Sequence, residues 1–316
     1  MTNTPAPRVS VIVPAFNAER TIRRALESAA RQSWRNIEIV IVDDGSTDRT
    51  GEIAAAFCAD EKRARLIRQP NGGESAARNR AISEATGEWI APLDADDLWH
   101  PDKIERQLET ARRIPEAGLV YCWSRLIDAD DEVIGTAPEA ELEGKVLLEH
   151  LGSNFVGNGS TPLISTLALG DLRYNPDFDA CADYLLQLQL AVRMPFAVVP
   201  AFLTGYRLSA TNTSSDALRM IRGHVRMFEF LIQHLNGGER AVAERQLSRW
   251  RARLGLVLLR RGQARDAASH IAKSLGRAPA AACREILHQV RVAAWPGGQT
   301  RVESGGSFFD LVPEQP

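Results

Sequence analysis

The tetrapeptide DADD occurs twice in this chain, at residues 94–97 and at residues 128–131. Each copy places three carboxylates within four residues, and carboxylate oxygens are hard ligands that suit Mg²⁺ or Mn²⁺. Aspartate is also common in solvated turns, because its side chain hydrogen-bonds to nearby backbone groups. The sequence around each copy therefore decides whether it forms a site or a turn.

The first copy follows the apolar run EWIAPL, which predicts a buried strand, and precedes the helical pattern LWHPDKIERQLETARRI. Ligands of open α/β sheets bind beyond the carboxyl ends of the strands. Asp94 and Asp96 are two residues apart, so at an extended strand end their side chains would point the same way. We predict that they bind a divalent cation, Mg²⁺ or Mn²⁺, which would offset the charge of a leaving diphosphate.

The second copy lies within LVYCWSRLIDADDEVIGTA, where apolar and polar residues alternate on both sides of it. This pattern predicts a β-hairpin, with Asp128, Asp130 and Asp131 in its turn. We therefore interpret the second copy as turn chemistry and the first copy as the site.

Strand and helix patterns alternate over the first third of the chain. Short apolar strands are predicted within residues 8–17, 36–44, 63–70 and 88–97, each followed by a helical segment. Near-continuous apolar strands of this kind form a mostly parallel, Rossmann-like sheet that helices cover on both faces, which is an α/β fold. Asn17, Asp43, Asp44 and the first DADD would then meet at one edge of the sheet, although Asn17 and Asp44 could also be turn or cap residues.

The pattern changes after about residue 118. Residues 145–215 mix short helical and strand patterns, and residues 216–295 are almost wholly helical. Within them, LGLVLLRRGQARDAASHIAKSLGRAP resembles one TPR-like helix pair, which predicts an all-α extension that serves packing or binds a protein partner. The Gly/Pro-rich residues 296–316 are predicted to be a flexible tail.

Composition excludes several classes of protein. A net charge of −2 and a pI near 6.3 argue against a nucleic-acid binder. The four cysteines form no CxxC pair, so we do not expect a structural zinc site. We expect the protein to occupy a reducing compartment. The sequence shows no signal peptide and no run of about 18 apolar residues. We expect a cytoplasmic protein, any membrane contact being peripheral, in which the NGS sequon at Asn158 is not glycosylated.

Two common nucleotide-binding motifs are missing. There is no GxxxxGK[ST] loop and no GxGxxG, which disfavours P-loop NTPases and Rossmann dehydrogenases. A nucleotidyltransferase would normally carry a Gly-rich basic loop near its first strand, and PAFNAER is not such a loop.

Three segments resemble the nucleotide-binding half of family 2 glycosyltransferases, which have the GT-A fold. They are VSVIVPAFNAERTIRRALESAARQSWRNIEIVIVDDGSTDRT, NGGESAARNRAI and GEWIAPLDADDLWHPDKI. The resemblance is close over residues 8–110 and extends with gaps to about residue 215. It implies a GT-A domain at 1–215, with a nucleotide-binding half at 8–117 and an acceptor-side half at 118–215.

The resemblance also implies a set of residues that bind a nucleotide-sugar. Pro14, Ala15 and Asn17 would line the nucleoside pocket, and Asp44 would contact the base or ribose. Gly73 would allow close approach of the backbone to the ligand, and Arg78 would contact the base or the phosphates. Asp94 and Ala95 would contact the donor, and Arg207 would contact its diphosphate. Arg78 could instead be a solvated helix residue.

The family carries a Glu-Asp pair in which the Asp is the catalytic base. The matching segment here is DACADYLLQLQLA, in which Asp183 keeps the carboxylate and Ala182 replaces the Glu. Asp183 could instead be an ordinary acid at a helix N-terminus. In YRLS, Leu208 follows Arg207 where relatives often have a His, so a third protein ligand to the cation is not expected.

The function that this resemblance implies is inverting transfer of a sugar from a nucleotide diphosphate donor, most simply a UDP-sugar. The acceptor would be a hydroxyl of a glycan or of a lipid-linked molecule. The alternative is a catalytically idle module that recruits partners through its helical tail, a reading that Ala182 and the altered YRLS segment favour.

Overall fold

The computed structural model of the chain describes residues 6–178, 180–209, 215–294 and Phe308. These residues form two compact units. The first contains the described residues up to Ser209, except Leu147–Asn154, together with Phe308. The second contains Leu147–Asn154 and the described residues from 215 to 294. The predicted tail at 296–316 lies outside the described residues, apart from Phe308.

The first unit is built on four parallel strands, as the apolar runs predict. They are β1 (Val9–Ala15), β2 (Ile37–Asp43), β3 (Ala64–Arg68) and β4 (Trp89–Pro92). Every residue of β1 and of β2 is buried, because helices cover both faces of the sheet. β1 pairs in parallel with both β2 and β4, and β2 pairs in parallel with β3.

The rest of the sheet is mixed. Its strands are β5 (Leu98–Trp99), β6 (Leu119–Ile127), β7 (Val133–Thr136), β8 (Leu163–Ser165) and β9 (Phe196–Arg207). The strand order is β3-β2-β1-β4-β8-β6-β9-β5, with β7 paired to β6. β6 and β9 are parallel, whereas β8 is antiparallel to both of its neighbours. The parallel character is thus complete in the first half of the sheet and partial in the second.

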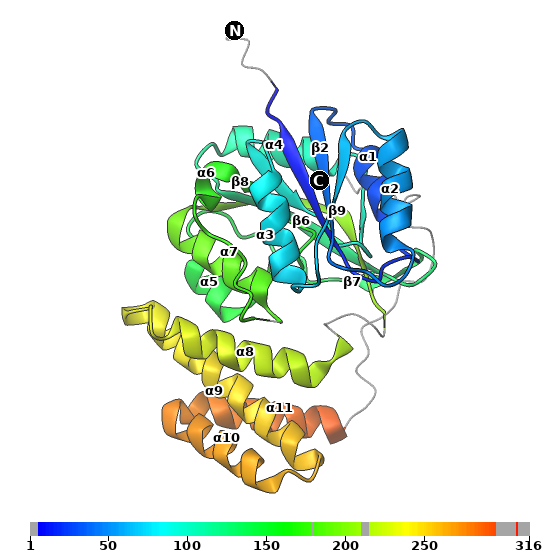
Figure 1. Cartoon of the computed structure of the whole chain (residues 1–316). Helices are drawn as coiled ribbons and strands as arrows, with labels where there is room; N and C mark the ends of the chain where they lie inside the picture. The colour runs from blue at the N-terminus through cyan, green and yellow to red at the C-terminus, as the bar shows by residue number, and fades with distance from the viewer. Residues whose placement is uncertain (1–5, 179, 210–214, 295–307, 309–316) are drawn as a thin grey trace. The chain divides into compact units, whose positions relative to one another are not determined.

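Seven helices of the described residues accompany this sheet in the sequence. They are α1 (Ile22–Ala30), α2 (Thr50–Asp60), α3 (Glu74–Glu84), α4 (Lys103–Arg113), α5 (Leu147–Gly152), α6 (Thr166–Leu169) and α7 (Ala182–Arg193). Figure 1 shows α1 and α2 on one side of the strands and α3 on the other. The predicted α/β fold is therefore confirmed.

The segment after the first DADD differs from its predicted helical pattern. Leu98 and Trp99 form strand β5, which pairs antiparallel with β9, and the helix begins only at Lys103. Pro101 explains why the helix does not include His100, because a proline disfavours helical backbone at the residue before it. Trp99 is fully buried, so it is a packing residue.

The second DADD lies in the predicted hairpin turn between β6 and β7, which pair antiparallel. Asp128 Oδ1 accepts hydrogen bonds from the backbone N–H groups of Asp130 (2.9 Å) and Glu132 (3.0 Å). Asp131 has φ +70°, a left-handed conformation that Asp tolerates better than most residues. The interpretation of this copy as a turn is confirmed.

The second unit is all α. After α5 it contains α8 (Ala217–Leu231), α9 (Gly237–Arg260), α10 (Ala264–Arg277) and α11 (Pro279–Ala294). α9 and α10 pack closely at Gly255, where an added Cβ would lie 2.6 Å from Ile271 Cγ1. The predicted helical extension is confirmed, and its likeness to TPR repeats stays a prediction. None of the helices in the described ranges combines the length and the apolar character needed to cross a membrane.

Candidate functional site

The parallel strands β1, β2 and β4 end at the same edge of the first unit. Asp44 N donates to Ala15 O at 2.8 Å, which joins the ends of β1 and β2. Leu93 N donates to Ile12 O at 3.0 Å, which holds the end of β4 against β1. Pro14 and Ala15 are buried here, so their backbone forms part of the floor of this edge.

Asn17 links the loops that follow β1 and β2. Its side-chain Oδ1 accepts from Thr47 N at 2.9 Å, and its backbone N–H donates to Ser46 Oγ at 3.1 Å. It is exposed and has φ +49°, which few residues other than glycine adopt. Asn17 thus stabilises the two loops by hydrogen bonding, and its contact with a nucleoside stays a prediction.

Asp44 organises the entry to α3. Its carboxylate accepts from the backbone N–H groups of Gly72 (2.9 Å) and Gly73 (2.8 Å) and from Gln69 Nε2 (2.7 Å). The side chain is 2% exposed. Asp44 is therefore a structural anchor of the glycine loop, and its contact with a base or ribose stays a prediction.

Gly73 immediately precedes α3. Its φ is +87°, a conformation that an L side chain rarely adopts, whereas an added Cβ would meet nothing within 4 Å. The backbone therefore requires glycine at this position, while the protein itself does not crowd the space beside it. That open space is compatible with the predicted approach of a ligand.

Arg78 on α3 is the centre of the site. Its Nη2 lies 2.5 Å from Asp94 Oδ1 and 2.6 Å from Glu74 Oε1, and the side chain is only 4% exposed. The guanidinium also lies over the Tyr174 ring, 5.1 Å from the ring centroid. Burial alone would lower the pKa of Arg78. The negative charges of Asp94 and Glu74 outweigh this effect and raise its pKa well above the ordinary value for arginine. Arg78 is thus a buried, permanently charged residue, not a solvated one.

One atom of Arg78 is unsatisfied. Its Nε is buried and has no hydrogen-bond partner in the described part of the chain. A buried donor without a partner is uncommon in native proteins and often marks the position of a water or ligand. This donor is one reason to expect an anionic group beside α3.

Two residues near Arg78 were not predicted from sequence. Glu74 lies four residues before Arg78 on the same helix, a spacing at which opposite charges meet, so the pattern could have revealed it. Tyr174 is held by Asn79, which donates through Nδ2 to Tyr174 O (2.7 Å) and accepts from Tyr174 N (2.9 Å). A pair 95 residues apart leaves no comparable signal in the sequence.

The loop at 155–162 passes directly over Asp94. A Cβ built on Gly159 would lie 3.0 Å from Arg78 Nη2 and 3.1 Å from Asp94 Oδ2, so a larger residue would crowd both side chains and glycine allows the loop to pack this closely. Ser160 Oγ accepts from Asp94 N at 3.0 Å and donates to Asp97 Oδ2 at 2.6 Å. The NGS tripeptide that begins at Asn158 is therefore part of the support of the first DADD.

The carboxylates of the first DADD have different environments. Burial and the charge of Asp94 raise the pKa of Asp96 to about 7. Burial and the same acidic neighbours raise the pKa of Asp97, which is completely buried and accepts from Arg207 N at 2.9 Å. Asp97 is hence a structural residue, and Asp94 and Asp96 are the two that remain for ligand chemistry. Ala95, between them, is buried.

Arg207 joins the two copies of DADD. Its Nε donates to Asp96 O at 2.7 Å, and its terminal nitrogens donate to Asp128 O and to the carboxylate of Asp131. The side chain is 2% exposed, so it lies inside the unit. The prediction that Arg207 contacts a diphosphate has no support in this geometry, because its guanidinium binds the protein's own backbone and Asp131. We assign it to positioning.

Asp183 lies in the first turn of α7, beside Arg78. Burial raises the pKa of Asp183, the positive charge of Arg78 opposes that shift, and the negative charge of Asp94 adds to it. Hydrogen bonds from its own N–H and that of Tyr184 also oppose the shift. The structure thus brings Asp183 into the same electrostatic environment as Arg78 and Asp94, although the three are far apart in the sequence.

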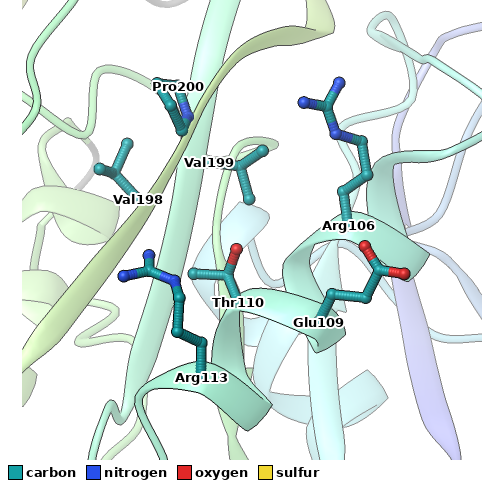
Figure 2. Close-up of a pocket in the computed structure, with 7 residues that line it drawn as sticks. All are labelled: Arg106, Glu109, Thr110, Arg113, Val198, Val199 and Pro200. Atoms are coloured by element: carbon teal, nitrogen blue, oxygen red, sulfur yellow. The ribbon is translucent and has the colours of Figure 1, made fainter. Parts of the chain in front are cut away.

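No set of three or more His, Cys, Asp and Glu side chains suited to a metal occurs within the described ranges. A pocket of about 290 Å³ lies elsewhere on the first unit, between α4 and β9 (Figure 2). Its lining residues are Arg106, Glu109, Thr110, Arg113, Val198, Val199 and Pro200. Since none of them belongs to the strand-end site, we do not assign donor binding to this pocket.

The comparison with known families identifies the domain that carries these residues. The model of glycosyl transferase family 2 matches residues 10–160, which include the ends of β1, β2 and β4, Arg78 and both copies of DADD. The chain carries a family 2 glycosyltransferase domain. The resemblance inferred from its motifs is thereby confirmed.

Curated relatives match this glycosyltransferase domain over part of their own length. A chondroitin synthase of Escherichia coli is 30% identical over 212 residues, which cover 67% of this chain and 30% of that protein. Matches to other curated relatives span between 13% and 47% of their lengths. The chain therefore corresponds to less than half the length of the curated relatives it matches.

Solved structures share the fold of the glycosyltransferase chain. TarS of S. aureus, in a complex with UDP-GlcNAc, is 18% identical with a TM-score of 0.68, and the match covers 92% of each chain. The mannosyltransferase PcManGT of Pyrobaculum calidifontis, in a complex with GDP-Man and Mn²⁺, is 19% identical with a TM-score of 0.64, covering 92% of this chain and 82% of that one. The predicted GT-A fold is confirmed by these likenesses.

Proposed function

We propose that this protein is an inverting glycosyltransferase that moves a sugar from a UDP-sugar to a hydroxyl of a glycan or lipid-linked acceptor in polysaccharide biosynthesis. The observation that carries the proposal is the convergence of Arg78, Asp94 and Asp183. A buried guanidinium bonded to the first Asp of a D-x-D, with a third carboxylate in its field, is an arrangement for holding a diphosphate next to a base.

The binding roles follow from where the chain places each residue. Pro14, Ala15 and Asn17 would line the nucleoside side of the edge, and the loop that Asp44 anchors would close it. Beside Gly73, the N-terminal turn of α3 offers backbone N–H groups to an anion, and Arg78 on the same helix offers a permanent positive charge. The donor's diphosphate would lie between this helix end and Asp94.

The residues present fit a divalent cation held jointly by protein and donor. Mg²⁺ and Mn²⁺ in phosphate sites take one or two carboxylates and complete their shell with phosphate oxygens and water. Asp94 and Asp96, two residues apart just after the end of β4, supply those two. Burial and the charge of Asp94 raise the pKa of Asp96, and a bound cation would favour the ionised carboxylate again. When bound, the cation would offset charge on the departing diphosphate.

Asp183 would act as the general base. Its carboxylate would accept the proton of the acceptor hydroxyl as the oxygen attacks the anomeric carbon opposite the diphosphate. Burial raises the pKa of Asp183, which makes it a stronger base than an exposed Asp, while Arg78 keeps the raised pKa from going higher still. Holding the two substrates in line would supply much of the acceleration.

Two observations favour the alternative of an idle binding module. Arg78 occupies Asp94 Oδ1 at 2.5 Å, so one oxygen of the D-x-D already has a partner, and Ala182 stands where the family carries a Glu. A module of this kind would bind a nucleotide without turning it over.

A donor assay separates the two functions. Purified chain with Mn²⁺ and UDP-sugars should release UDP by slow hydrolysis, and EDTA should abolish the release. An idle module would bind UDP in calorimetry but release none from any UDP-sugar. Failure to bind UDP with or without Mn²⁺ would contradict the proposal itself.

A further inference from the structure

The second unit carries an unusual share of the chain's positive charge. Residues 216–294 contain fifteen Arg or Lys and six Asp or Glu, a net charge of +9 within a chain whose total is −2. A surplus of this size attracts anionic ligands, and a cavity within it concentrates the field. A surplus of positive charge can be spread over the surface of a unit or concentrated at one site.

Part of the surplus gathers in one pocket. A pocket of about 430 Å³ lies between α9 and α10. Its lining residues are Arg240, Glu244, Arg251, Lys273, Gly276 and Arg277. Four of the six are cations and one is an acid, so the lining is strongly positive.

The acids nearby do not neutralise these cations. Glu244 Oε1 is shared by Arg240 (3.2 Å) and Arg277 (3.3 Å). Arg251 pairs with Glu229 on α8 at 2.6 Å. Lys273 has no ion pair in the described part of the chain, and the buried Nε of Arg251 has no hydrogen-bond partner there. Charge and donor capacity are thus left over on this side of the unit.

Gly276 keeps the pocket open. It lies in the last turn of α10, its backbone does not need a positive φ, and an added Cβ would meet nothing within 4 Å. Neither backbone geometry nor packing therefore requires glycine here, although glycine weakens a helix relative to alanine. A longer side chain at this position would project into the space that the cations surround.

The positive charges that line the pocket also affect His270 on α10. Burial lowers its pKa, and the charges of Lys273 and Arg251 lower it further, against the weaker opposing charges of Glu229 and Asp266. Its buried Nδ1 has no hydrogen-bond partner among the described residues. An anion bound between Lys273 and Arg251 would raise this pKa, which makes the imidazole a local reporter.

We propose that this pocket is a second ligand site, separate from the donor site, that binds a phosphate-bearing ligand. Three of its cations are arginines, whose planar fork binds phosphate oxygens in pairs, and Lys273 adds a point charge. The shared chemistry is the phosphate group, whether on a free diphosphate or on an anionic lipid headgroup.

Calorimetry with inorganic pyrophosphate tests the site. EDTA is present throughout, so that the donor site has no divalent cation. The wild-type chain should bind, Lys273→Glu should weaken binding at least tenfold, and the matched control Arg265→Glu should change it less than twofold. Arg265 is an exposed residue of the same helix that does not line the pocket. Equal weakening by both variants would show diffuse charge attraction and overturn the proposal.

Gly276→Gln separates a shaped site from a charged surface, because it fills the pocket without changing the charge. We expect this variant to melt at a temperature no lower than wild type and to lose pyrophosphate binding at least tenfold. Undiminished binding by the folded variant would contradict a site in this pocket.

Two further measurements locate the ligand and its source. Pyrophosphate should raise the pKa of His270 in an NMR titration of the full chain, and His270→Asn identifies its signal. Sedimentation with phosphatidylglycerol vesicles, compared with phosphatidylcholine vesicles, tests for a lipid headgroup, with Lys273→Glu and Arg265→Glu as before. Binding in either arm that depends on Lys273 supports the site. Binding in neither arm, or binding only to a carboxylated oligosaccharide, overturns it.

Discussion

At the scale of single residues, the site depends on one buried cation and the carboxylates around it. Arg78 has Glu74 and Asp94 within ion-pair distance and Asp183 within its field, so no one of these charges has its ordinary environment. Catalytic groups commonly lie in such places, because burial and specific partners shift their pKa values.

Asp183→Asn tests the base. The amide keeps the size of the side chain but cannot accept a proton, so turnover should fall by about 10²–10⁴ while the affinity for UDP stays nearly unchanged. Steady-state kinetics and calorimetry measure the two effects. Asp171→Asn is the control, since Asp171 is 88% exposed and pairs only at the surface with Arg193. Parallel loss of affinity and turnover, or loss of neither, would show that Asp183 is not the base.

Asp96→Ala tests the assignment of the two DADD copies. It should abolish the Mn²⁺-dependent part of UDP binding, because one of the two carboxylates proposed to bind the cation is lost. Asp130→Ala removes a carboxylate from the hairpin turn and should bind UDP and Mn²⁺ like wild type. Calorimetry that gave the reverse order of effects would refute the metal assignment.

The residue scale also shows where sequence reasoning stops. Asp94, Arg78 and Asp183 were predicted because each lies in a short motif with a recognisable neighbourhood. The contacts of Ser160 with Asp97 and of Arg207 with Asp131 were not, since their partners lie 63 and 76 residues away. A serine or an arginine has many uses, and only the folded backbone decides which one applies.

At the scale of elements, the hairpin and the site loop are joined. Arg207 ends β9, donates to the backbone of Asp96, and forms an ion pair with Asp131 in the turn between β6 and β7. The hairpin and the strand before the first DADD were predictable from their apolar patterns, whereas β9 was not predicted as a strand. The link that Arg207 makes between them was not predicted, because Arg207 was expected to contact the diphosphate of a donor.

Arg207→Ala should therefore destabilise the fold by about 3–5 kcal/mol, the usual cost of removing one partner from a buried ion pair. Arg24→Ala is a matched control, because Arg24 pairs with the same Asp131 at 2.9 Å but is 35% exposed. It should cost no more than about 1 kcal/mol. Urea denaturation of both variants measures the difference, and equal costs would show that Arg207 is not the structural link.

At the scale of the whole molecule, one buried acid ties together most of the parallel sheet. Glu38 on β2 is 1% exposed and accepts from Ser10 Oγ (2.6 Å), Thr86 N (2.7 Å) and Arg65 Nη1 (2.5 Å). Burial alone would raise the pKa of Glu38, but these hydrogen bonds lower it to about 2. The carboxylate therefore stabilises the fold above its unfolded pKa of 4.5, and that contribution is lost as the pH falls towards 2.

A shift of this size corresponds to about 3 kcal/mol at pH 7. Glu38→Gln should lower the free energy of unfolding by a similar amount at pH 7 and flatten its decline between pH 4.5 and pH 2. Glu27→Gln changes a 40% exposed acid on α1 and should do neither. Denaturant titrations across this pH range measure both, and an unchanged acid profile in Glu38→Gln would count against the role of Glu38.

The hydrogen bonds of the loop at 155–162 should also affect how fast its amides exchange with deuterium. Hydrogen bonds from Trp99 Nε1 to Ser160 O (2.9 Å), from Asn158 Nδ2 to Ser124 Oγ (2.8 Å) and from Gln107 Nε2 to Thr161 O (2.8 Å) hold it to the interior. Within the loop, Ser160 N donates to Asn158 Oδ1 at 2.9 Å. Loop amides usually exchange with deuterium within seconds, because they open without unfolding anything else. The Ser160 amide should instead exchange as slowly as those of β1, since releasing it breaks contacts with several elements at once. The cover over Asp94 would then be a fixed wall of the site, and substrates would have to enter past some other edge.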